Sequence, residues 1–521
     1  MTAGRAADTP IRRGRFCATR PYVRTVTEIL VWHRSDLRPA DNAALAAAAL
    51  DGDPVPLFCF DPQFYGADGL ACDARLRFLH ESLADLRGQY RALGSDLALL
   101  HGDPRERLRD LLDEYDALYV NRDVTARYGR DRDDDVFAWD AVRAFGGDGI
   151  VRDADETRSE WREQATAWME ADPHPAPETL PANPLDSEVT IDDIETRYDT
   201  SPTKTNAPEG GRAPALRRLD RFVDSVPAYP GNVAPPAAAE SGCSRLSAYL
   251  KFGCLSVREV YQRIQSAPAC RGREMYESRL FWNRHYKQKL ADWAGWTDRA
   301  VNPVFRGYNR SNHDPELLAA WKEGRTGFPL VDAAMRALVE TGFINFRMRA
   351  MCASFLTYVL REPWQYGADF YYYHLIDADP GINHTQWQSQ AGVVGVHPVR
   401  VYDPAKQVRE YDPDGEFVCE YVPELAALPD AHLPRPEKAP LAALDEAGIE
   451  LGADGNYPRP VVDYERRASE ARDRFARLSD RAREAIETPT VWRRASLSRN
   501  RREQLRETDA EADGQASLDD F

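Results

Sequence analysis

Two carboxylates, a carboxamide and an indole lie close together in the stretch DADPGINHTQWQSQ, residues 377–390. Asp377 and Asp379 are two positions apart. Asn383 follows four positions after the second acid, and Trp387 four positions after the amide. Such groups can accept hydrogen bonds, donate them and, for the indole, be oxidised. A helix start explains the acids equally well, because Asp is a common cap and proline suits a first helical turn.

A second candidate is the segment GCSRLSAYLKFGCLS, which places hydroxyls and a guanidinium just before an apolar helical stretch. Ser244, Arg245 and Ser247 are the residues concerned. Hydroxyls and backbone N–H groups at a helix N-terminus, with an arginine beside them, predict a phosphate-binding loop. Helix capping alone explains the same residues.

The segment FINFRMRAM carries two arginines on a helix that is otherwise apolar on one side. Arg347 and Arg349 occupy alternate positions, so one of them can face inward. A buried arginine needs an acidic partner, and Asp377 or Asp379 can supply it. The segment therefore predicts an ion pair with the first stretch.

Composition bounds the class of protein. A chain of 521 residues with 43% hydrophobic residues is expected to form two to four domains. Its eight cysteines include no CxxC pair, which indicates neither a disulfide framework nor a metal site. We find no signal peptide and no apolar run of about 18 residues. We therefore expect a cytoplasmic protein that has no metal and does not contact a membrane.

The formal net charge of −17 would ordinarily argue against a nucleic-acid partner, because phosphate contacts need local lysine or arginine. However, the chain has only seven lysines against 60 arginines, and its surface-like segments are rich in aspartate. This balance indicates a salt-rich, haloarchaeal cytoplasm, in which an acidic surface maintains solubility. Net charge then says little about partners.

Patterning divides the chain into five parts. A basic arm covers residues 1–26. Residues 27–155 alternate β-rich runs (EILVWH, PVPLFCF, DLALLHG, ALYVNRD and GIVRD) with helical ones, which predicts a doubly wound parallel sheet. Residues 156–212 are polar and rich in proline, as in an interdomain linker. Helical periodicity predicts a large all-helical domain at 213–465, followed by a charged helix and a disordered tail at 466–521.

Together these segments resemble the photolyase/cryptochrome family. The similarity runs from about residue 27 to residue 460 and keeps one order of motifs: LVWHRSDLRPADNAALAAAA, SRLSAYLKFGCLS, EGRTGFPLVDAAMRAL, LIDADPGINHTQWQ and YDPDGEFVCEYVPEL. The resemblance implies an α/β antenna domain followed by a helical domain that holds FAD in a U-shaped conformation. It also implies a monomer.

The resemblance assigns a role to each residue of a flavin site. The pyrophosphate would be held by Tyr229 and by the loop Cys243, Ser244, Arg245, Leu246 and Ser247. Cys243 stands where threonine is frequent, so its contact would be made through the backbone N–H. Asp377 and Asp379 would bind the ribityl chain and ring edges, with Arg349 pairing Asp377 against the isoalloxazine. Asn383 would face flavin N5, where a carboxamide can donate or accept.

The resemblance also implies a chain of electron donors to the flavin. Trp387 matches its first tryptophan and Trp364 its second. Core packing is the ordinary role of a tryptophan in a helical domain, and family position favours electron transfer for these two. Ser311 occupies the expected place of the third, and Tyr308 is the substitute that we consider.

Two functions remain open at this point. In a photolyase, light-excited reduced FAD splits a flipped pyrimidine dimer in damaged DNA; in a cryptochrome, the same pocket is a light sensor. Trp282 matches the dimer-stacking tryptophan, and Arg347 and Arg400 match residues that contact DNA phosphates. The pocket departs from common dimer photolyases at four positions, which are Arg279, Phe346, Ala350 and Ser389. No His-His pair supports repair of (6-4) photoproducts.

The last residues, QASLDDF, favour repair. Gln515, Leu518 and Phe521 resemble the peptide by which replication and repair proteins bind a sliding clamp, although an incidental tail sequence is the alternative. An antenna chromophore is also implied, and the sequence leaves open whether it is 8-hydroxy-deazaflavin or methenyl-tetrahydrofolate.

Overall fold

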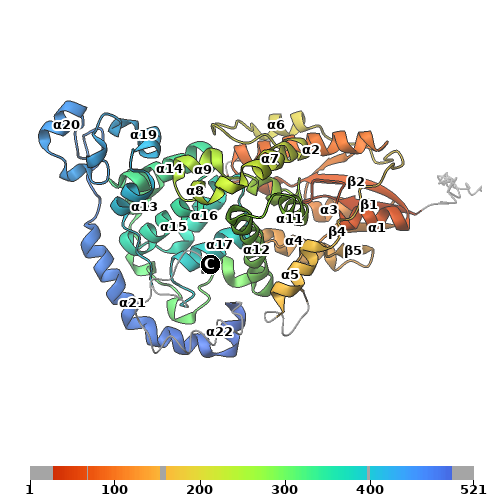
Figure 1. The fold of residues 1–521 in the computed structure, drawn as a ribbon. Helices are drawn as coiled ribbons and strands as arrows, with labels where there is room; N and C mark the ends of the chain where they lie inside the picture. The colour runs from red at the N-terminus through yellow and green to blue at the C-terminus, as the bar shows by residue number, and fades with distance from the viewer. Residues whose placement is uncertain (1–26, 67, 153–159, 396–398, 496–521) are drawn as a thin grey trace, which may run out of the picture.

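The computed structural model describes residues 27–66, 68–152, 160–395 and 399–495. The predicted basic arm at 1–26 lies outside the described residues, as does the tail with Gln515, Leu518 and Phe521. The described chain forms an α/β domain followed by a larger helical domain (Figure 1). The predicted fold class is therefore confirmed. No described helix is long and apolar enough to cross a membrane.

A five-stranded parallel sheet with the order β3-β2-β1-β4-β5 forms the centre of the α/β domain. Its strands are β1 (Glu28–Trp32), β2 (Asp53–Phe60), β3 (Ala98–His101), β4 (Ala117–Asn121) and β5 (Val142–Phe145). The central strand β1 pairs in parallel with β2 and β4, so its apolar residues are buried on both faces. The chain changes direction across the sheet between β1 and β4, which makes their carboxyl ends the topological switch point.

One predicted strand was wrong. The described part of GIVRD, residues 149–152, forms no strand, and the edge position is taken by β5 at Val142–Phe145. The residues of β5 are only partly buried or exposed, so they lack the apolar run that identified the other four strands. A short edge strand with one exposed side does not need that run.

Helices cover both faces of the sheet, and two hydrophobic clusters fill the space between them. The helices of this domain are α1 (Ala43–Asp51), α2 (Asp73–Ala92), α3 (Pro104–Leu111) and α4 (Tyr128–Phe137). The first begins where the Asn42 side chain accepts a hydrogen bond from the Leu45 N–H at 3.0 Å, an N-cap that fixes where the chain leaves β1.

The predicted linker at 156–212 contains structure that the sequence did not indicate. It carries α5 (Trp161–Glu170) and α6 (Ile191–Tyr198), which starts with a capping box between Thr190 and Asp193. Met169 and Ile194 are fully buried, so the segment packs against the domains it connects. Proline-rich stretches on either side hid the helical periodicity of these short elements.

Helices also make up the rest of the described chain. The α-helices of the second domain are α7 (Arg212–Ser225), α8 (Tyr229–Asn232), α9 (Pro236–Gly242), α10 (Ser247–Lys251), α11 (Val257–Gln265), α12 (Arg271–Asp292), α13 (Pro315–Lys322), α14 (Pro329–Thr341), α15 (Phe346–Ser354), α16 (Trp364–His374), α17 (Pro380–Gln390), α18 (Pro404–Tyr411), α19 (Glu416–Tyr421) and α20 (Leu441–Ala447). A π-helical segment follows α15 at Phe355–Leu360. Short 3-10 turns occur at Pro62–Phe64, Val226–Ala228, Ala294–Thr297, Pro303–Phe305, Arg310–Asn312, Pro423–Leu425, Asp430–His432 and Pro436–Lys438.

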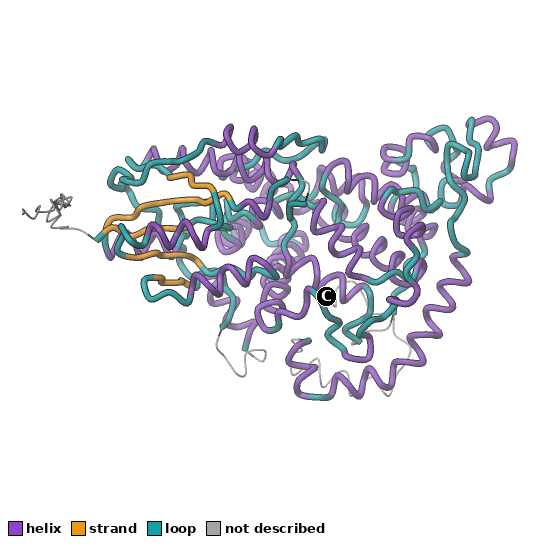
Figure 2. Tube along the Cα trace, turned by 180° about the vertical axis from the view of Figure 1, so that it is seen from behind, coloured by secondary structure: helices purple, strands orange, loops and turns teal. Residues whose placement is uncertain are grey.

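The charged C-terminal helix belongs to the helical domain. The helix α21 (Tyr464–Glu487) crosses the predicted boundary at residue 465, and α22 (Pro489–Arg494) follows it. Both run along one edge of the molecule (Figures 1 and 2). Ile486 and Val491 share a buried cluster with Val124 of the α/β domain. The C-terminal helices therefore contribute to a hydrophobic cluster that includes residues of both domains.

Candidate functional site

A cavity of about 390 Å³ lies among helices of the second domain. All ten residues predicted to bind the cofactor line it: Tyr229, Cys243, Ser244, Arg245, Leu246, Ser247, Arg349, Asp377, Asp379 and Asn383. They come from segments far apart in the sequence, and the fold brings them to one surface. This volume is typical of a pocket that takes a cofactor-sized ligand.

The predicted ion pair between Arg349 and Asp377 is present at the cavity wall. One guanidinium nitrogen, Nη2, donates to both carboxylate oxygens at 3.1 and 3.2 Å, and the Arg349 Nε donates to the Ile344 carbonyl at 2.9 Å. The Asn345 side chain caps α15 at the Met348 N–H, which sets the turn on which the arginine lies. The pair is therefore held in a fixed orientation between α15 and the segment before α17.

Asp379 is held by the protein through both carboxylate oxygens. Oδ1 accepts a hydrogen bond from the Ile382 N–H at 3.1 Å and so caps α17. Oδ2 lies 3.0 Å from Lys287 Nζ and 3.8 Å from Lys251 Nζ. Burial acts to raise the pKa of Asp379, but the two lysines outweigh it, so the pKa lies below its ordinary value and the group is ionised at neutral pH.

Asn383 lies one turn into α17, and its amide orientation is set by a neighbouring helix. Nδ2 donates to the Ala368 carbonyl of α16 at 2.8 Å. This bond leaves the carboxamide oxygen and the second Nδ2 hydrogen available to a ligand. Such an oxygen accepts a hydrogen bond from a protonated ring nitrogen.

The loop before α10 combines strain with cationic character. Arg245 has a φ of 52°, in the left-handed region that a bulky residue rarely adopts, and its guanidinium lies 3.6 Å from the centre of the Phe343 ring. The Tyr276 hydroxyl donates to Ser244 Oγ at 3.0 Å. Burial raises the pKa of Cys243 to about 11, so its thiol is neutral and does not repel a phosphate.

These groups fit FAD. The Arg245 loop offers cationic and N–H donors to a diphosphate, and the Asp377 side-chain oxygens can accept hydrogen bonds from ribityl hydroxyls or a ring N–H. Asn383 lines the same cavity, whose apolar lining suits a flat ring.

Comparisons with known proteins agree with this geometry. The family pattern described as the FAD binding domain of DNA photolyase matches residues 276–477, and that of DNA photolyase matches residues 29–145. A deoxyribodipyrimidine photo-lyase of Synechococcus is 30% identical over 88% of this chain and 98% of its own length. The chain belongs to the photolyase/cryptochrome family.

Both branches of this photolyase/cryptochrome family are represented among its relatives. A cryptochrome DASH of Gloeobacter violaceus is 34% identical over 84% of this chain and 93% of its own length. The crystal structure of a class III photolyase from Agrobacterium tumefaciens has a TM-score of 0.73 at 27% identity, covering 90% of this chain and 100% of that one.

The first predicted electron donor, Trp387, is tightly enclosed by its neighbours. Trp387 is 3% exposed, and its ring centre lies 5.0 Å from that of Tyr371 and 6.1 Å from that of Trp321. A Cβ atom at Gly367 would lie 2.1 Å from the indole, so only glycine allows this approach of α16. Trp364, the second predicted donor, begins α16 and is also 3% exposed.

Tyr308, considered as the third donor, is covered by α21. Phe475 packs edge-on to its ring at 5.2 Å, and the Arg474 guanidinium lies 4.9 Å from the ring centre. Burial raises the pKa of Tyr308, so the phenol is neutral. Trp387, Trp364 and Tyr308 share one hydrophobic cluster but do not line the flavin cavity.

The predicted DNA-contacting residues do not all have the same environment. Trp282 lines the cavity with the Arg279 guanidinium 4.1 Å from its ring centre. Arg347 also lines it, but it stacks on Tyr411 at 3.8 Å and is only 9% exposed. Arg400 is partly buried and lies outside the cavity lining, where its carbonyl accepts a hydrogen bond from the Ser354 hydroxyl at 2.9 Å.

A second cavity, of about 160 Å³, lies at the carboxyl ends of β1 and β2, close to the switch point. The α/β domain contributes His33, Arg34 and Asp61, among others. Lys251 and Ala378 line both this cavity and the flavin cavity. The two cavities are therefore separated by one shared wall.

The sequence reasoning missed the two lysines at the flavin cavity, Lys251 and Lys287. A signal was available, because only seven lysines occur among 521 residues and a rare cation inside a helical segment is conspicuous. It also missed Arg279 as a neighbour of Trp282, since the three-residue spacing on α12 was not used.

The ion pair at the cavity wall yields the first prediction. Asp377→Asn leaves Arg349 without its carboxylate, and FAD affinity is expected to fall by about tenfold or more, because hydrogen bonds to charged groups contribute about 1.5–3 kcal/mol. Fluorescence titration of the apoprotein with FAD measures this. Glu424→Gln, which breaks the similarly buried pair with Arg336 away from the cavity, is the control. Equal losses in both variants would contradict a specific role.

The enclosed indole yields the second prediction. Trp387→Phe is expected to retain FAD but to lose most of the photoreduction of oxidised flavin under blue light with an external reductant. Trp293→Phe, on a partly buried tryptophan that does not line the flavin cavity, is the control and is expected to photoreduce normally. Unchanged photoreduction in Trp387→Phe would show that electrons enter by another route.

Proposed function

We propose that this protein is a blue-light-driven DNA photolyase that splits cyclobutane pyrimidine dimers. Bound in the cavity, reduced FAD would supply the light-excited electron for that reaction. Support comes from the relatives of Synechococcus and Halobacterium salinarum that bear the name deoxyribodipyrimidine photo-lyase, which match at 30% and 31% identity along nearly their whole length.

One observation carries the proposal: an aromatic platform and a flavin-facing amide line the same cavity. Trp282 offers a large face on which an unstacked base can lie, and Asn383 lines that cavity from α17. Arg347 adds a cation suited to a DNA phosphate. A dimer flipped out of damaged DNA would thus lie beside the electron donor.

The surrounding residues would prepare this site rather than take part in bond breaking. The Arg349–Asp377 pair orients the ligand, and the carboxamide oxygen of Asn383 can hold a proton on flavin N5 by accepting its hydrogen bond. Trp387 and Trp364 would resupply electrons through α17 and α16, and Tyr308 would extend that route.

A blue-light photoreceptor of the cryptochrome type is the second candidate, favoured by one specific contact. The Arg279 guanidinium lies over the Trp282 ring, 4.1 Å from its centre, and so covers one of the two faces on which a base could stack. Repair requires that Arg279 give way to the dimer. Signalling makes no such demand, because a partner would read only the state of the flavin.

The second cavity is the proposed place of an antenna chromophore. Its place at the carboxyl ends of parallel strands is the usual ligand site of such sheets, and its wall adjoins the flavin cavity. Both 8-hydroxy-deazaflavin and methenyl-tetrahydrofolate remain candidates. A fluorescence spectrum of the chromophore released from purified protein distinguishes them.

Repair is the third prediction. Illuminating the purified, reduced protein with an oligonucleotide that contains a thymine dimer is expected to restore thymines, and Trp282→Ala is expected to lose most of this activity because it removes the stacking face. Trp293→Ala serves as the matched control. A flavin-containing wild-type protein that restores no thymines under blue light would contradict repair and favour the photoreceptor.

Recruitment by a sliding clamp is the fourth prediction. The tail residues Gln515, Leu518 and Phe521 lie outside the described structure, and the proposal depends on their spacing alone. A peptide of residues 510–521 is expected to bind purified clamp in a calorimetric titration. The absence of binding, or equal binding after Leu518→Ala with Phe521→Ala, would contradict it.

A further inference from the structure

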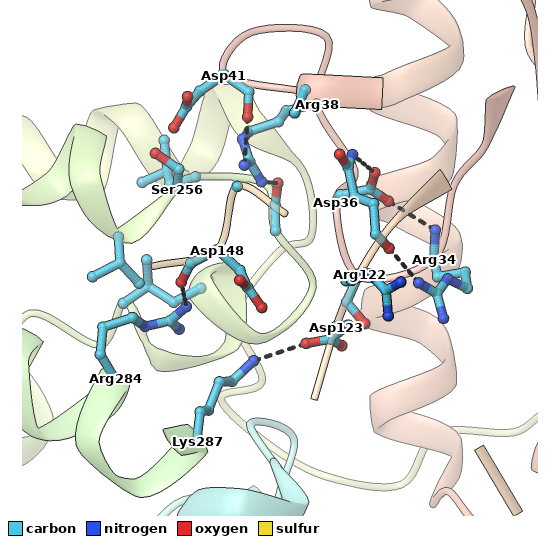
Figure 3. A pocket seen from close by; sticks show the side chains of 18 of the residues that line it. Arg34, Asp36, Arg38, Asp41, Arg122, Asp123, Asp148, Ser256, Arg284 and Lys287 are labelled. Atoms are coloured by element: carbon cyan, nitrogen blue, oxygen red, sulfur yellow. Dashed lines mark hydrogen bonds and ion pairs between the residues drawn. The ribbon is translucent and has the colours of Figure 1, made fainter. Parts of the chain in front are cut away.

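Four buried or partly buried side chains, Asp123, Lys287, Asp379 and Lys251, form a charge network from the α/β domain to the flavin cavity. Lys287 Nζ lies 3.2 Å from Asp123 Oδ1 and 3.0 Å from Asp379 Oδ2. Lys251 Nζ lies 3.8 Å from the same Asp379 oxygen. Figure 3 shows Lys287 reaching from the helical domain towards Asp123.

The charge network crosses the boundary between the domains. Asp123 follows β4, whereas Lys287 lies on α12, Lys251 ends α10 and Asp379 caps α17. The last three line the flavin cavity, and Asp123 does not. A residue of the α/β domain is therefore coupled to the wall of the flavin cavity, through a direct contact with Lys287.

Little solvent screens these charges. The side chains of Asp379 and Lys287 are 2% and 6% exposed, and those of Asp123 and Lys251 are 12% and 15% exposed. Charges removed from water act on their neighbours over a longer range than exposed charges do. Because the charge network consists of two acids and two lysines, its four side chains together carry no net charge.

The small charged cavity beside Asp123 offers no reason for another ligand. Two of its arginines already donate within the protein: Arg284 to the Asp148 carbonyl at 2.7 Å, and Arg38 to the carbonyls of Asp41 and Gly253 at 2.8 Å (Figure 3). Lys287, Lys251 and Asp379 of the charge network line the flavin cavity. The network can therefore act on a ligand bound there.

We propose that Asp123, Lys287 and Lys251 set the reduction potential of the flavin, so that the antenna domain takes part in tuning it. The inference rests on FAD occupying the cavity, as in the proposed function. Reduction places negative charge on the flavin, so a positive change in the wall favours the reduced form and a negative change opposes it. Because the charge network is neutral, the reduction potential lies between the values that a positive and a negative wall would give.

The proposal predicts shifts of opposite sign, which is the fifth prediction. Asp123→Asn leaves the charge network with one excess positive charge, and the midpoint potential of the flavin is expected to rise. Lys287→Met leaves one excess negative charge, and the potential is expected to fall. Lys251→Met is expected to shift it in the same direction by less, because its Nζ lies farther from Asp379 and is more exposed.

The measurement is a dye-coupled redox titration of the full-length holoprotein in the dark, without DNA. Lys287→Arg keeps the charge and is expected to stay near the wild-type potential. Asp41→Asn is the matched control: Asp41 is a buried acid of the α/β domain that pairs with Arg258 across the same boundary but does not line the flavin cavity. Asparagine also tolerates the positive φ of that position.

The outcomes separate a charge effect from general damage. Shifts of the same sign in Asp123→Asn and Lys287→Met, or a shift in Asp41→Asn as large as that in Asp123→Asn, would overturn the proposal. If Lys287→Met does not fold, Asp123→Asn and Lys251→Met still give the two signs. Opposite shifts without thymine repair would leave this inference standing while contradicting the photolyase, and a wild-type chain that takes up no FAD would overturn both.

Discussion

Asp379 is the group on which the flavin cavity depends. One carboxylate oxygen caps α17, and the other lies between lysines of α10 and α12, so three walls of the cavity meet at one buried charge. Removing one partner of such a group leaves an uncompensated charge out of water, which destabilises a protein by about 3–5 kcal/mol. The walls therefore cannot separate independently, and Asn383 and Trp387, which follow on α17, keep their positions.

The same charge connects the two domains. Lys287 binds both Asp379 and Asp123, and Lys251 also lines the second cavity. In the proposed function, an antenna chromophore in one domain and a flavin in the other would need a constant separation. The Lys287 contacts contribute a directional geometry to the boundary between these domains.

How much was predictable depended on the range of the interaction. Strands β1 to β4 were recognised from their buried apolar runs, and the Arg349–Asp377 pair from the need of a buried arginine for an acid. The edge strand β5 and the helices α5 and α6 were missed because partial exposure and flanking prolines weaken their patterns. The contact of Lys287 with Asp123 joins residues 164 positions apart, and no local pattern encodes it.

Gly367 shows how a residue without any redox chemistry can govern an electronic property. Its missing side chain lets α16 approach the Trp387 indole to a separation that a single methyl group would prevent. For the electron route proposed above, the small volume of residue 367 would shorten the distance over which this indole exchanges electrons, and electron tunnelling weakens steeply with distance. Selection on that rate would then act on a single hydrogen atom, because an alanine methyl group would force α16 and the indole apart.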